Sequence, residues 1–465
     1  MSKEKQMNRR RFLKLASSVG LGATCGMSLN SQLFAATDNY AGPLWIMINA
    51  EGGWDVTSLC DPKGYNGLND ANNPDRLNNY DSNRIGRVGN LSYAPVPDDF
   101  LSTGIFYDAN LYSAKAFFEK YYQRLLVMNG IDCQTNSHDN GQLYNFSGRL
   151  LAGYPSFSAI VSGSLAAQLP LSFLTNGGYS AAAGLVTPVR MSNSSLRALY
   201  EIAYPNRSSN PKLSSSRVYL PDEIEALIAS TSAQRHQSLL QQQNLPRIKK
   251  AIEQLQLSRS DTSKLQGLAD NLENQLPMSE VGFNGRDRAY RLYEQGRVAL
   301  AAYQQGLTAS VNVHMSGFDT HAKHDEYHYP LLMDLLQGVD AILEEARLRG
   351  LQNKIVVVIA SDFGRANKYN KEKGKDHWPI SSALFLGNAT QIIRGNRVIG
   401  ATDANHKAFQ IDPLTLQPDV TNSNIGSIKL TPAHFHLALR RLAGVENLSP
   451  AIAYPINVEQ LNLFI

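Results

Sequence analysis

The chain has 465 residues, of which 43% are hydrophobic and 18% are charged, and its formal net charge is +4. This length allows one large domain or two ordinary ones, with a sizeable buried core. The charge is mild and the sequence has no basic stripe with interleaved aromatic residues, so we expect no nucleic-acid partner.

The N-terminal segment predicts an export signal. It has a basic start, a middle of apolar and small residues, and an alanine-rich end, which is the layout of such signals. Arg9 and Arg10 closely resemble the twin-arginine motif, which implies the twin-arginine translocation machinery as a partner and a periplasmic or extracellular location. The apolar run is too short, and too rich in Gly and Ser, for a lasting membrane span. We expect residues 1–36 to be the signal and residues 37–465 to be the mature chain.

The chain has three cysteines, and Cys25 leaves with the signal. Thr24 and Gly22 before it fit a lipoprotein signal poorly. The mature chain keeps Cys60 and Cys133, whose pairing cannot be deduced from sequence. No two cysteines stand at metal-ligand spacing, so a CxxC site is excluded.

Apolar strands and helices alternate along the first part of the mature chain. Residues 43–50 form a continuous apolar run, which fits a strand buried on both faces. Residues 111–122 carry apolar side chains at helical spacing, and residues 124–130 fit another buried strand. Helix followed by strand is typical of a parallel α/β sheet.

The middle of the chain predicts a helical insertion over about residues 216–285. This part is rich in Gln, Ser and Lys, and leucines recur at helical spacing from Leu265 to Leu276. We expect a helical hairpin that is broken near Pro246. A glutamine-rich amphipathic helix is usually a solvated surface helix, so we assign it no chemistry.

The α/β alternation then returns. We expect helices at residues 286–306 and 329–350, an alternating strand at residues 309–315 and a buried strand at residues 353–361. The last helix is predicted to start at Thr431, which is a good cap followed by a first-turn proline. The whole pattern predicts an α/β fold with a mostly parallel sheet.

Polar side chains follow four of the predicted strands, at the point where each strand ends. In chain order they are Asp55, then Ser137, His138 and Asp139, then Asp319, Thr320 and His321, then Asp362, with Asp376 and His377 in the loop beyond. Ligands of open α/β sheets bind beyond the carboxyl ends of the strands, and in a parallel sheet these ends share one edge. We therefore expect groups far apart in the sequence to meet at one place.

A bound metal explains this combination of residue types. Carboxylates and neutral imidazoles without thiolates suit zinc, manganese, iron or magnesium rather than a structural cysteine site. Several carboxylates converging without a cation would repel each other and raise one another's pKa values. A metal removes that problem, activates water or a serine hydroxyl, and clamps the oxygens of a phosphoryl or sulfuryl group.

Each residue also has a plain structural interpretation. An Asp after a strand is more often a helix cap than a ligand, and Ser137 fits an ordinary helix N-cap. His324 and His328 are expected on the surface of a helix start, and the loop around His377 is basic and expected to be solvated. Only the recurrence of such groups at strand ends favours the joint hypothesis of a site.

Five short motifs resemble the recurring marks of a bacterial family of unknown function, domain of unknown function 1501, which is usually exported by the twin-arginine route. They are GGWD at residues 52–55, NSHD at 136–139, GFDTH at 317–321, SDFGR at 361–365 and KDHW at 375–378. Their order and positions match over nearly the whole mature chain. The motifs are specific as a set, although no single one is.

That family is similar to the alkaline phosphatase and sulfatase superfamily. The resemblance implies a three-layer α/β/α sandwich, with metals beyond the strand ends and a Ser or Thr nucleophile between them. One or two divalent ions (zinc, manganese or calcium) are implied. Carried over by position, the implied ligands of one metal are Asp55 and Asp362, and those of the other are Asp319, His321 and His377. The implied nucleophile is Ser137, and the resemblance implies that Arg365 stabilises an anionic oxygen.

This chain departs from the superfamily at several of these positions. Phe363 follows Asp362 where superfamily enzymes commonly have a histidine, so one ligand of the first metal is missing. Asp319 and His321 are only two residues apart, which leaves His324 as another partner for Asp319. His138 is an equally plausible ligand beside the proposed nucleophile.

Two functional hypotheses follow. The first is an exported, metal-dependent hydrolase of phosphate or sulfate esters, which acts on a small anionic ester with a serine nucleophile. The second is a non-catalytic exported protein that keeps the fold to bind a ligand or a partner protein, as the loss of a histidine at Phe363 suggests. A redox protein is a weaker third idea, because the sequence has no Rossmann glycine pattern and no haem motif.

Overall fold

The computed structural model describes residues 40–98, 100, 111–191, 203–209, 211–260, 262–273, 283, 286–387, 393–421 and 424–465. The chain divides into two units, Met1–Asp38 and Asn39–Ile465, and everything described below belongs to the second unit. The predicted export signal at residues 1–36 lies outside the described residues.

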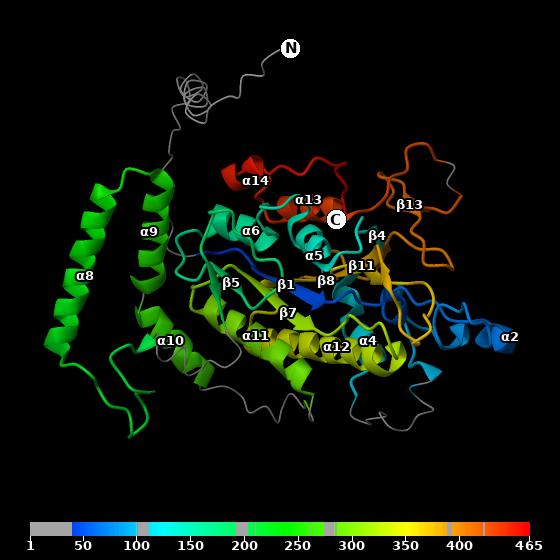
Figure 1. The fold of residues 1–465 in the computed structure, drawn as a ribbon, viewed down its shortest axis with the longest axis horizontal. Helices are drawn as coiled ribbons and strands as arrows, with labels where there is room; N and C mark the ends of the chain where they lie inside the picture. The colour runs from blue at the N-terminus through cyan, green and yellow to red at the C-terminus, as the bar shows by residue number, and fades with distance from the viewer. Residues whose placement is uncertain are drawn as a thin grey trace, which may run out of the picture. The chain divides into compact units, whose positions relative to one another are not determined.

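An eight-stranded sheet lies at the centre of the second unit (Figure 1). Its strands, in spatial order, are β12 (Arg397–Ile399), β4 (Leu125–Asp132), β11 (Ile380–Leu386), β8 (Ile355–Ser361), β1 (Leu44–Glu51), β7 (Ser310–Ser316), β5 (Phe173–Thr175) and β6 (Pro188–Arg190). β11 is antiparallel to both of its neighbours, and the other neighbouring pairs are parallel. β1, β4, β7 and β8 therefore all point their carboxyl ends toward the same edge, as the sequence predicts.

Helices cover both faces of the sheet (Figure 1). One face carries α4 (Ala114–Tyr121), α11 (Asp287–Gln304) and α12 (His324–Leu348), and the other carries α5 (His138–Ser147), α6 (Phe157–Leu165) and α13 (Pro432–Leu442). Strand β1 shows why two cores form. Its alternate residues Leu44, Ile46 and Ile48 belong to the first core, whereas Trp45 and Met47 belong to the second. The fold is the expected three-layer α/β/α sandwich with a mostly parallel sheet.

Helices α8 (Asp222–Gln242), α9 (Pro246–Ser260) and α10 (Thr262–Glu273) lie between β6 and β7 in the sequence, and Pro246 is the first residue of α9. Leu265, Leu268 and Leu272 of α10 are buried in the first core. In contrast, α8 has no buried residue.

Short elements complete the described structure. They are α2 (Gly67–Ala71), α14 (Ser449–Ala453), the strands β2 (Gly86–Val88), β3 (Leu91–Tyr93), β9 (Gly364–Arg365), β10 (His377–Trp378), β13 (Gln410–Ile411) and β14 (Pro418–Asp419), and the 3-10 turns η1 (Val56–Ser58), η2 (Ser82–Arg84) and η3 (Tyr122–Arg124).

Some expected boundaries differ from the structure. α12 begins at His324, five residues before the expected helix, and α14 follows α13, so the helix that begins after Thr431 is not the last one. Thr431 is the N-cap that the sequence predicts, within a capping box that includes His434. Among the described residues, no helix is long and apolar enough to cross a membrane. Cys60 and Cys133 are both buried free thiols.

Candidate metal centre

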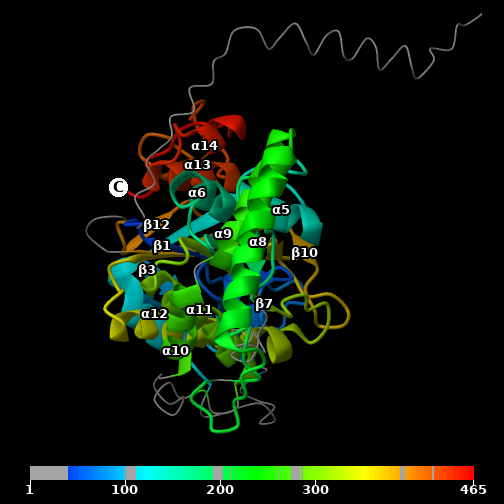
Figure 2. The same ribbon diagram turned by 90° about the vertical axis from the view of Figure 1, so that its left-hand side faces the viewer.

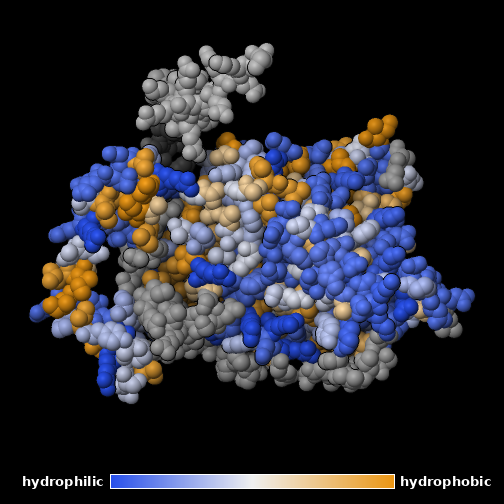
Figure 3. Space-filling view, in the orientation of Figure 1, coloured by the Kyte–Doolittle hydropathy of each residue, from blue (hydrophilic) through white to orange (hydrophobic). Residues whose placement is uncertain are grey.

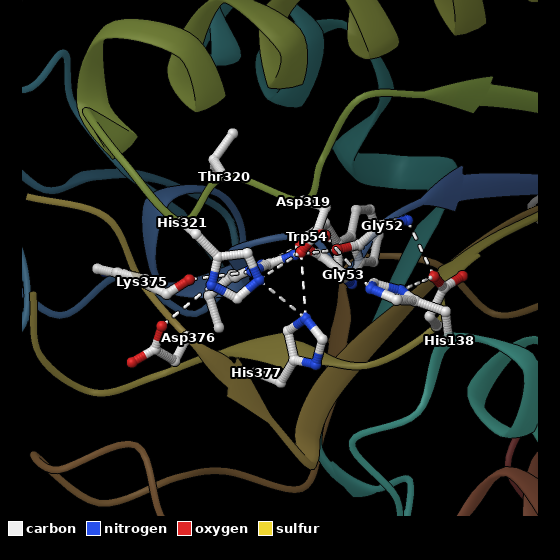
Figure 4. Close-up of polar contacts among 12 residues, drawn as sticks. Gly52, Gly53, Trp54, His138, Asp319, Thr320, His321, Lys375, Asp376 and His377 are labelled. Atoms are coloured by element: carbon white, nitrogen blue, oxygen red, sulfur yellow. Dashed lines mark hydrogen bonds and ion pairs between the residues drawn. The ribbon is translucent and has the colours of Figure 1, made fainter. Parts of the chain in front are cut away.

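Three side chains from distant parts of the sequence meet at the carboxyl edge of the sheet: His138 at the start of α5, Asp319 in the loop after β7, and His377 at the start of β10. One ligand atom each of His138, Asp319 and His377 lies within 4.8 Å of the others. The Nε2 atoms of His138 and His377 lie 3.5 and 3.1 Å from the two carboxylate oxygens of Asp319 (Figure 4). A tetrahedral zinc ion with ligand distances of about 2.0–2.1 Å holds its ligand atoms about 3.3 Å apart. The three residues therefore fit a divalent metal ion in both chemistry and spacing.

His321 presents a further nitrogen to the same place. Its Nε2 lies 2.9 Å from Oδ1 of Asp319 and 3.1 Å from Nε2 of His377 (Figure 4). The two nitrogens and the carboxylate oxygen thus face one another across hydrogen-bond distances. His321 is therefore positioned as an additional ligand beside the three that meet most closely.

The outer nitrogen of each imidazole is occupied by an acceptor. Nδ1 of His377 lies 2.8 Å from the carbonyl oxygen of Asn136, Nδ1 of His321 lies 3.0 Å from Asp376, and Nδ1 of His138 lies 2.8 Å from Asp362. A carbonyl oxygen can only accept, so Nδ1 of His377 carries the proton and a neutral ring leaves a bare lone pair at Nε2. Metal-bound histidines are usually oriented by such outer acceptors.

This tautomer has an electrostatic consequence. With the protons on Nδ1, the Nε2 lone pairs of His321 and His377 point toward each other and toward the Asp319 carboxylate. Such a cluster of lone pairs is repulsive unless a cation, either an extra proton or a metal ion, lies among them. The arrangement is therefore a candidate cation site.

Asp362 lies behind His138 rather than among the facing ligand atoms. Its Oδ2 accepts from Gly52 N at 2.9 Å as well as from the His138 ring, and the side chain is fully buried. Burial raises the pKa of Asp362, whereas the hydrogen bond from the imidazole raises the pKa of His138. Asp362 therefore orients the His138 ring from the side opposite the candidate metal centre. Its assignment as a metal ligand stays a prediction.

Asp55 lies in a closed, buried network. Its Oδ2 is 2.9 Å from Nε2 of His324 and 2.6 Å from Nζ of Lys375, and its Oδ1 accepts from Thr57. Burial opposes ionisation of Asp55, but Lys375 and His324 outweigh it and hold its pKa well below the usual range. The structure therefore does not bring Asp55 to the facing ligand atoms, because its charge is already balanced by a lysine.

Thr320 closes a ring of hydrogen bonds around Asp55. The Asp55 N–H donates to Nε2 of His328, whose Nδ1 lies 2.9 Å from the Thr320 hydroxyl. That hydroxyl lies 2.8 Å from Nδ1 of His324, whose Nε2 reaches back to the Asp55 carboxylate. One set of neutral tautomers satisfies every member of this ring. Burial lowers the pKa values of His324 and His328, which agrees with neutral rings.

Two sequence expectations about this region are wrong, because His324 and His328 are 1% and 0% exposed and are not surface residues. The basic loop before His377 is largely exposed, as expected, but Lys375 within it is fully buried. The i, i+4 spacing of the two histidines was the available signal, because it places both on one face of α12. That face packs toward Phe318, whose ring lies 5.4 Å from that of His328.

Arg365 is a buried arginine that positions the loops of the site. Its Nη2 donates to the Asp319 carboxylate at 2.6 Å and to the Gly52 carbonyl oxygen. Its Nε donates to the Gly53 carbonyl oxygen at 2.7 Å, and its Nη1 donates to the Lys375 carbonyl oxygen at 3.0 Å. Burial lowers the pKa of Arg365. Burial also opposes ionisation of Asp319, but Arg365 outweighs it and holds the pKa of Asp319 at about 2. A contact of Arg365 with an anion stays a prediction.

Gly52 and Gly53 let these loops approach. Gly52 has φ +119°, and a Cβ there would lie 2.5 Å from the backbone nitrogen of Asp319. Gly53 has φ +84°, and a Cβ there would lie 2.6 Å from the Phe363 ring. That ring packs against the imidazole of His377, with the ring centroids 4.5 Å apart. Phe363 is therefore an apolar wall of the site.

Ser137 precedes His138 at the N-cap position of α5. It is exposed, and its side chain makes no capping hydrogen bond. Ser137 therefore holds the N-cap position that the sequence suggests, but without the side-chain hydrogen bond of a cap. In the sequence it directly precedes the candidate ligand His138.

A polar cavity of about 300 Å³ adjoins the site. It is lined by Glu51, Gln142, Thr175, Gly177, Gly178, Ser180, Arg190 and His314. Glu51 directly precedes Gly52, and Gln142 lies one turn after His138 on α5. The cavity lies at the carboxyl edge of the sheet, where β1, β5 and β6 end, and has hydrogen-bond donors and acceptors on its walls, although none of the clustered ligands lines it.

One family model matches residues 44–419, and its description is protein of unknown function (DUF1501). No curated protein matches the chain. Three solved structures are similar to this chain. Ps i-CgsB in complex with k-i-k-neocarrahexaose is 8% identical, with 91% of this chain and 75% of that chain covered and a TM-score of 0.35. The PsFucS1 sulfatase from Pseudoalteromonas sp. is 10% identical (86% of this chain, 70% of that chain, TM-score 0.30), and TAB5 alkaline phosphatase is 8% identical (77% of this chain, 94% of that chain, TM-score 0.30). These likenesses are distant and say nothing of what this chain binds.

Proposed function

We propose that this chain, which belongs to the family described as protein of unknown function (DUF1501), is a metal-dependent hydrolase of phosphate or sulfate esters. The observation that carries the proposal is the pair of Nε2 atoms of His321 and His377, which lie 3.1 Å apart and both within 3.1 Å of the Asp319 carboxylate. Lone pairs so arranged need a cation, and imidazole with carboxylate suits zinc or manganese.

The residues support one bound ion. It would be held by His138, Asp319 and His377, with His321 beside them. A second ion at Asp55 is not needed, since the buried ammonium of Lys375 already balances that carboxylate. When bound, a divalent ion lowers the pKa of a nearby hydroxyl and neutralises charge on a transferring phosphoryl or sulfuryl group.

The chain's own residues supply the remaining functions. Ser137 Oγ would attack the phosphorus or sulfur atom, the bond to the alcohol oxygen would break, and the serine proton would leave with the alcohol. Water would then hydrolyse the serine ester and restore the hydroxyl. The first-turn N–H groups of α5, which begins at His138, favour an anionic group at this position. The adjoining polar cavity would hold the alcohol part of the ester.

Three variants assayed on aryl phosphates and aryl sulfates test this function. We expect Ser137→Ala to abolish turnover and keep the metal, and Asp319→Asn to lose both. Asp139→Asn is the matched control, because Asp139 is an exposed carboxylate on the same turn of α5 that is not among the clustered ligands. Turnover that is insensitive to chelators, or unchanged in Ser137→Ala, would rule out this mechanism.

A non-catalytic binding role is the second candidate. The observation that favours it is Phe363, whose ring packs on both His138 and His377 where a further ligand is absent. A protein that binds metal stoichiometrically but turns over neither ester class would support this role. Reproducible turnover that chelators abolish would exclude it.

Export by the twin-arginine route to the periplasm or the cell exterior is part of the proposal. It rests on Arg9 and Arg10 in the N-terminal segment. A double Arg9→Lys, Arg10→Lys variant should remain in the cytoplasm, while the unaltered chain is recovered outside it. Equal export of both chains would contradict the route.

A further inference from the structure

The α8–α9 hairpin carries a large uncovered apolar face. α8 has 21 residues and none of them is buried, and no described element covers it on the side that Figure 2 shows. Figure 3 shows apolar side chains gathered on this hairpin. The large exposed apolar residues are Ile224 (42%), Leu227 (61%), Ile228 (53%) and Leu239 (46%) of α8, Leu245 (59%) of the turn, and Ile248 (42%) and Leu255 (49%) of α9.

An isolated hairpin of this kind is poorly stabilised. Most helical stability in proteins comes from packing of an apolar face rather than from intrinsic propensity. Exposed apolar patches of this extent usually mark an interaction site. Within the part of the chain that the structure describes, nothing covers this face, so it is suited to a partner.

The charges at the two ends of the hairpin have opposite sign. The first turn of α8 is acidic, with Asp222, Glu223 and Glu225. α9 begins beside the turn that joins the helices, and its first residues include Arg247, Lys249 and Lys250. One end of α8 is thus acidic and apolar, and the other end, with the start of α9, is basic and apolar.

We propose that the hairpin pairs with the same hairpin of a second copy of this chain, around a twofold axis. In a twofold interface the same patch is used by both copies, so a patch must be complementary to itself. Antiparallel pairing places the acidic end of each hairpin on the basic end of the other. It also places Ile224, Leu227 and Ile228 of one copy on Leu239, Leu245 and Ile248 of the other.

The size of the face suits a dimer. At 1.5 Å per residue, α8 is ~30 Å long and α9 is ~22 Å long, and each helix is ~10 Å wide, which gives a face of about 500 Å² per copy. Two such faces bury about 1,000 Å² in total, which is the lower limit for a specific interface. The two hairpins together form a four-helix arrangement with a shared apolar core.

The mass of the full chain in solution, measured by light scattering and sedimentation, tests the pairing. We expect twice the mass of one chain, which is 51.2 kDa. A Leu227→Asp, Ile248→Asp variant should have the mass of one chain while near-UV circular dichroism shows a folded core. A single-chain mass for the unaltered protein at micromolar concentration would overturn the proposal.

Charge reversal tests the orientation of the two copies. Glu223→Lys with Glu225→Lys, or Lys249→Glu with Lys250→Glu, should each raise the dimer dissociation constant about tenfold or more. All four changes together should restore it to within a few-fold. Lys407→Glu with Lys429→Glu is the matched control, because both are exposed lysines outside the hairpin. A dimer unaffected by either reversal, or a single chain that binds anionic vesicles through Leu227 and Ile248, would overturn it.

Discussion

Lys375 Nζ lies 2.6 Å from Oδ2 of Asp55, and neither side chain is exposed to solvent. The two residues are 320 positions apart in the sequence, and Lys375 also donates to Asn78 at 2.6 Å. A buried charge pair of this kind anchors the loop before His377 to the loop after β1. It also separates Asp55 from the candidate metal centre.

Lys375→Met should destabilise the fold strongly. It leaves the Asp55 carboxylate buried without its cation, which typically costs about 3–5 kcal/mol. Urea unfolding at pH 7 measures this, with Lys371→Met in the exposed part of the same loop as control. The double variant Asp55→Asn, Lys375→Met should cost less than the two single changes added together. A loss below about 1 kcal/mol for Lys375→Met would contradict a buried ion pair.

Gly141→Ala should weaken metal binding from a distance. A Cβ at Gly141 would lie 2.3 Å from the carbonyl oxygen of Asp362, so α5 must shift away from the loop after β8. That shift moves His138, which begins α5. We expect lower metal affinity together with a loss of about 1–3 kcal/mol in stability. Asn140→Ala, at the exposed neighbouring position, should change neither quantity. Equal metal affinity in both variants would show that the contact does not position His138.

His436 should make the fold sensitive to acid. Burial lowers its pKa to about 3, while an unfolded histidine has a pKa of about 6.5. Between these values the unfolded chain binds a proton that the native chain does not, so stability falls as the pH falls below about 6.5, by about 1.4 kcal/mol per pH unit. At pH 5 this residue accounts for a loss of about 2 kcal/mol relative to neutral pH.

Urea unfolding at pH 7 and pH 5 checks the role of His436. In His436→Gln the stability difference between the two pH values should shrink by about that 2 kcal/mol. His236→Gln, on the uncovered helix α8, should leave the difference unchanged. If both variants kept the full difference, the acid sensitivity would come from other groups.

The sheet and the edge that carries the candidate site could be predicted from the sequence because the signals are local. β1 and β8 are apolar runs buried on both faces. Asp362 directly follows β8, whereas Asp319 lies in the loop after β7 and His138 begins α5 after the loop that follows β4. β11 was not predicted, because Ser381 and Ser382 interrupt its apolar run even though both are buried in the sheet. Very short strands such as β5 carry no periodicity to read.

The resemblance names Asp319 and His321 of GFDTH as ligands, but residue spacing does not decide between His321 and His324 and gives no role for Thr320. Asp319 and His321 face the candidate metal centre, whereas Thr320 between them points into the buried ring with His324 and His328. Residue type allowed either role for each histidine. His324 lies in the buried network because it contacts Asp55, whose charge is balanced by Lys375 from a distant loop. No local sequence pattern encodes the pairing of Asp55 with Lys375.

The metal content of the purified protein, prepared without a metal-affinity tag, tests the central claim most directly. Elemental analysis of the unaltered chain should find about one equivalent of zinc, manganese or iron, Asp139→Asn should match it, and Asp319→Asn should retain almost none. A chain that takes up no metal after incubation with these ions, or an Asp319→Asn variant that keeps the full equivalent, would contradict the account. The facing nitrogens of His321 and His377 would then share a proton instead.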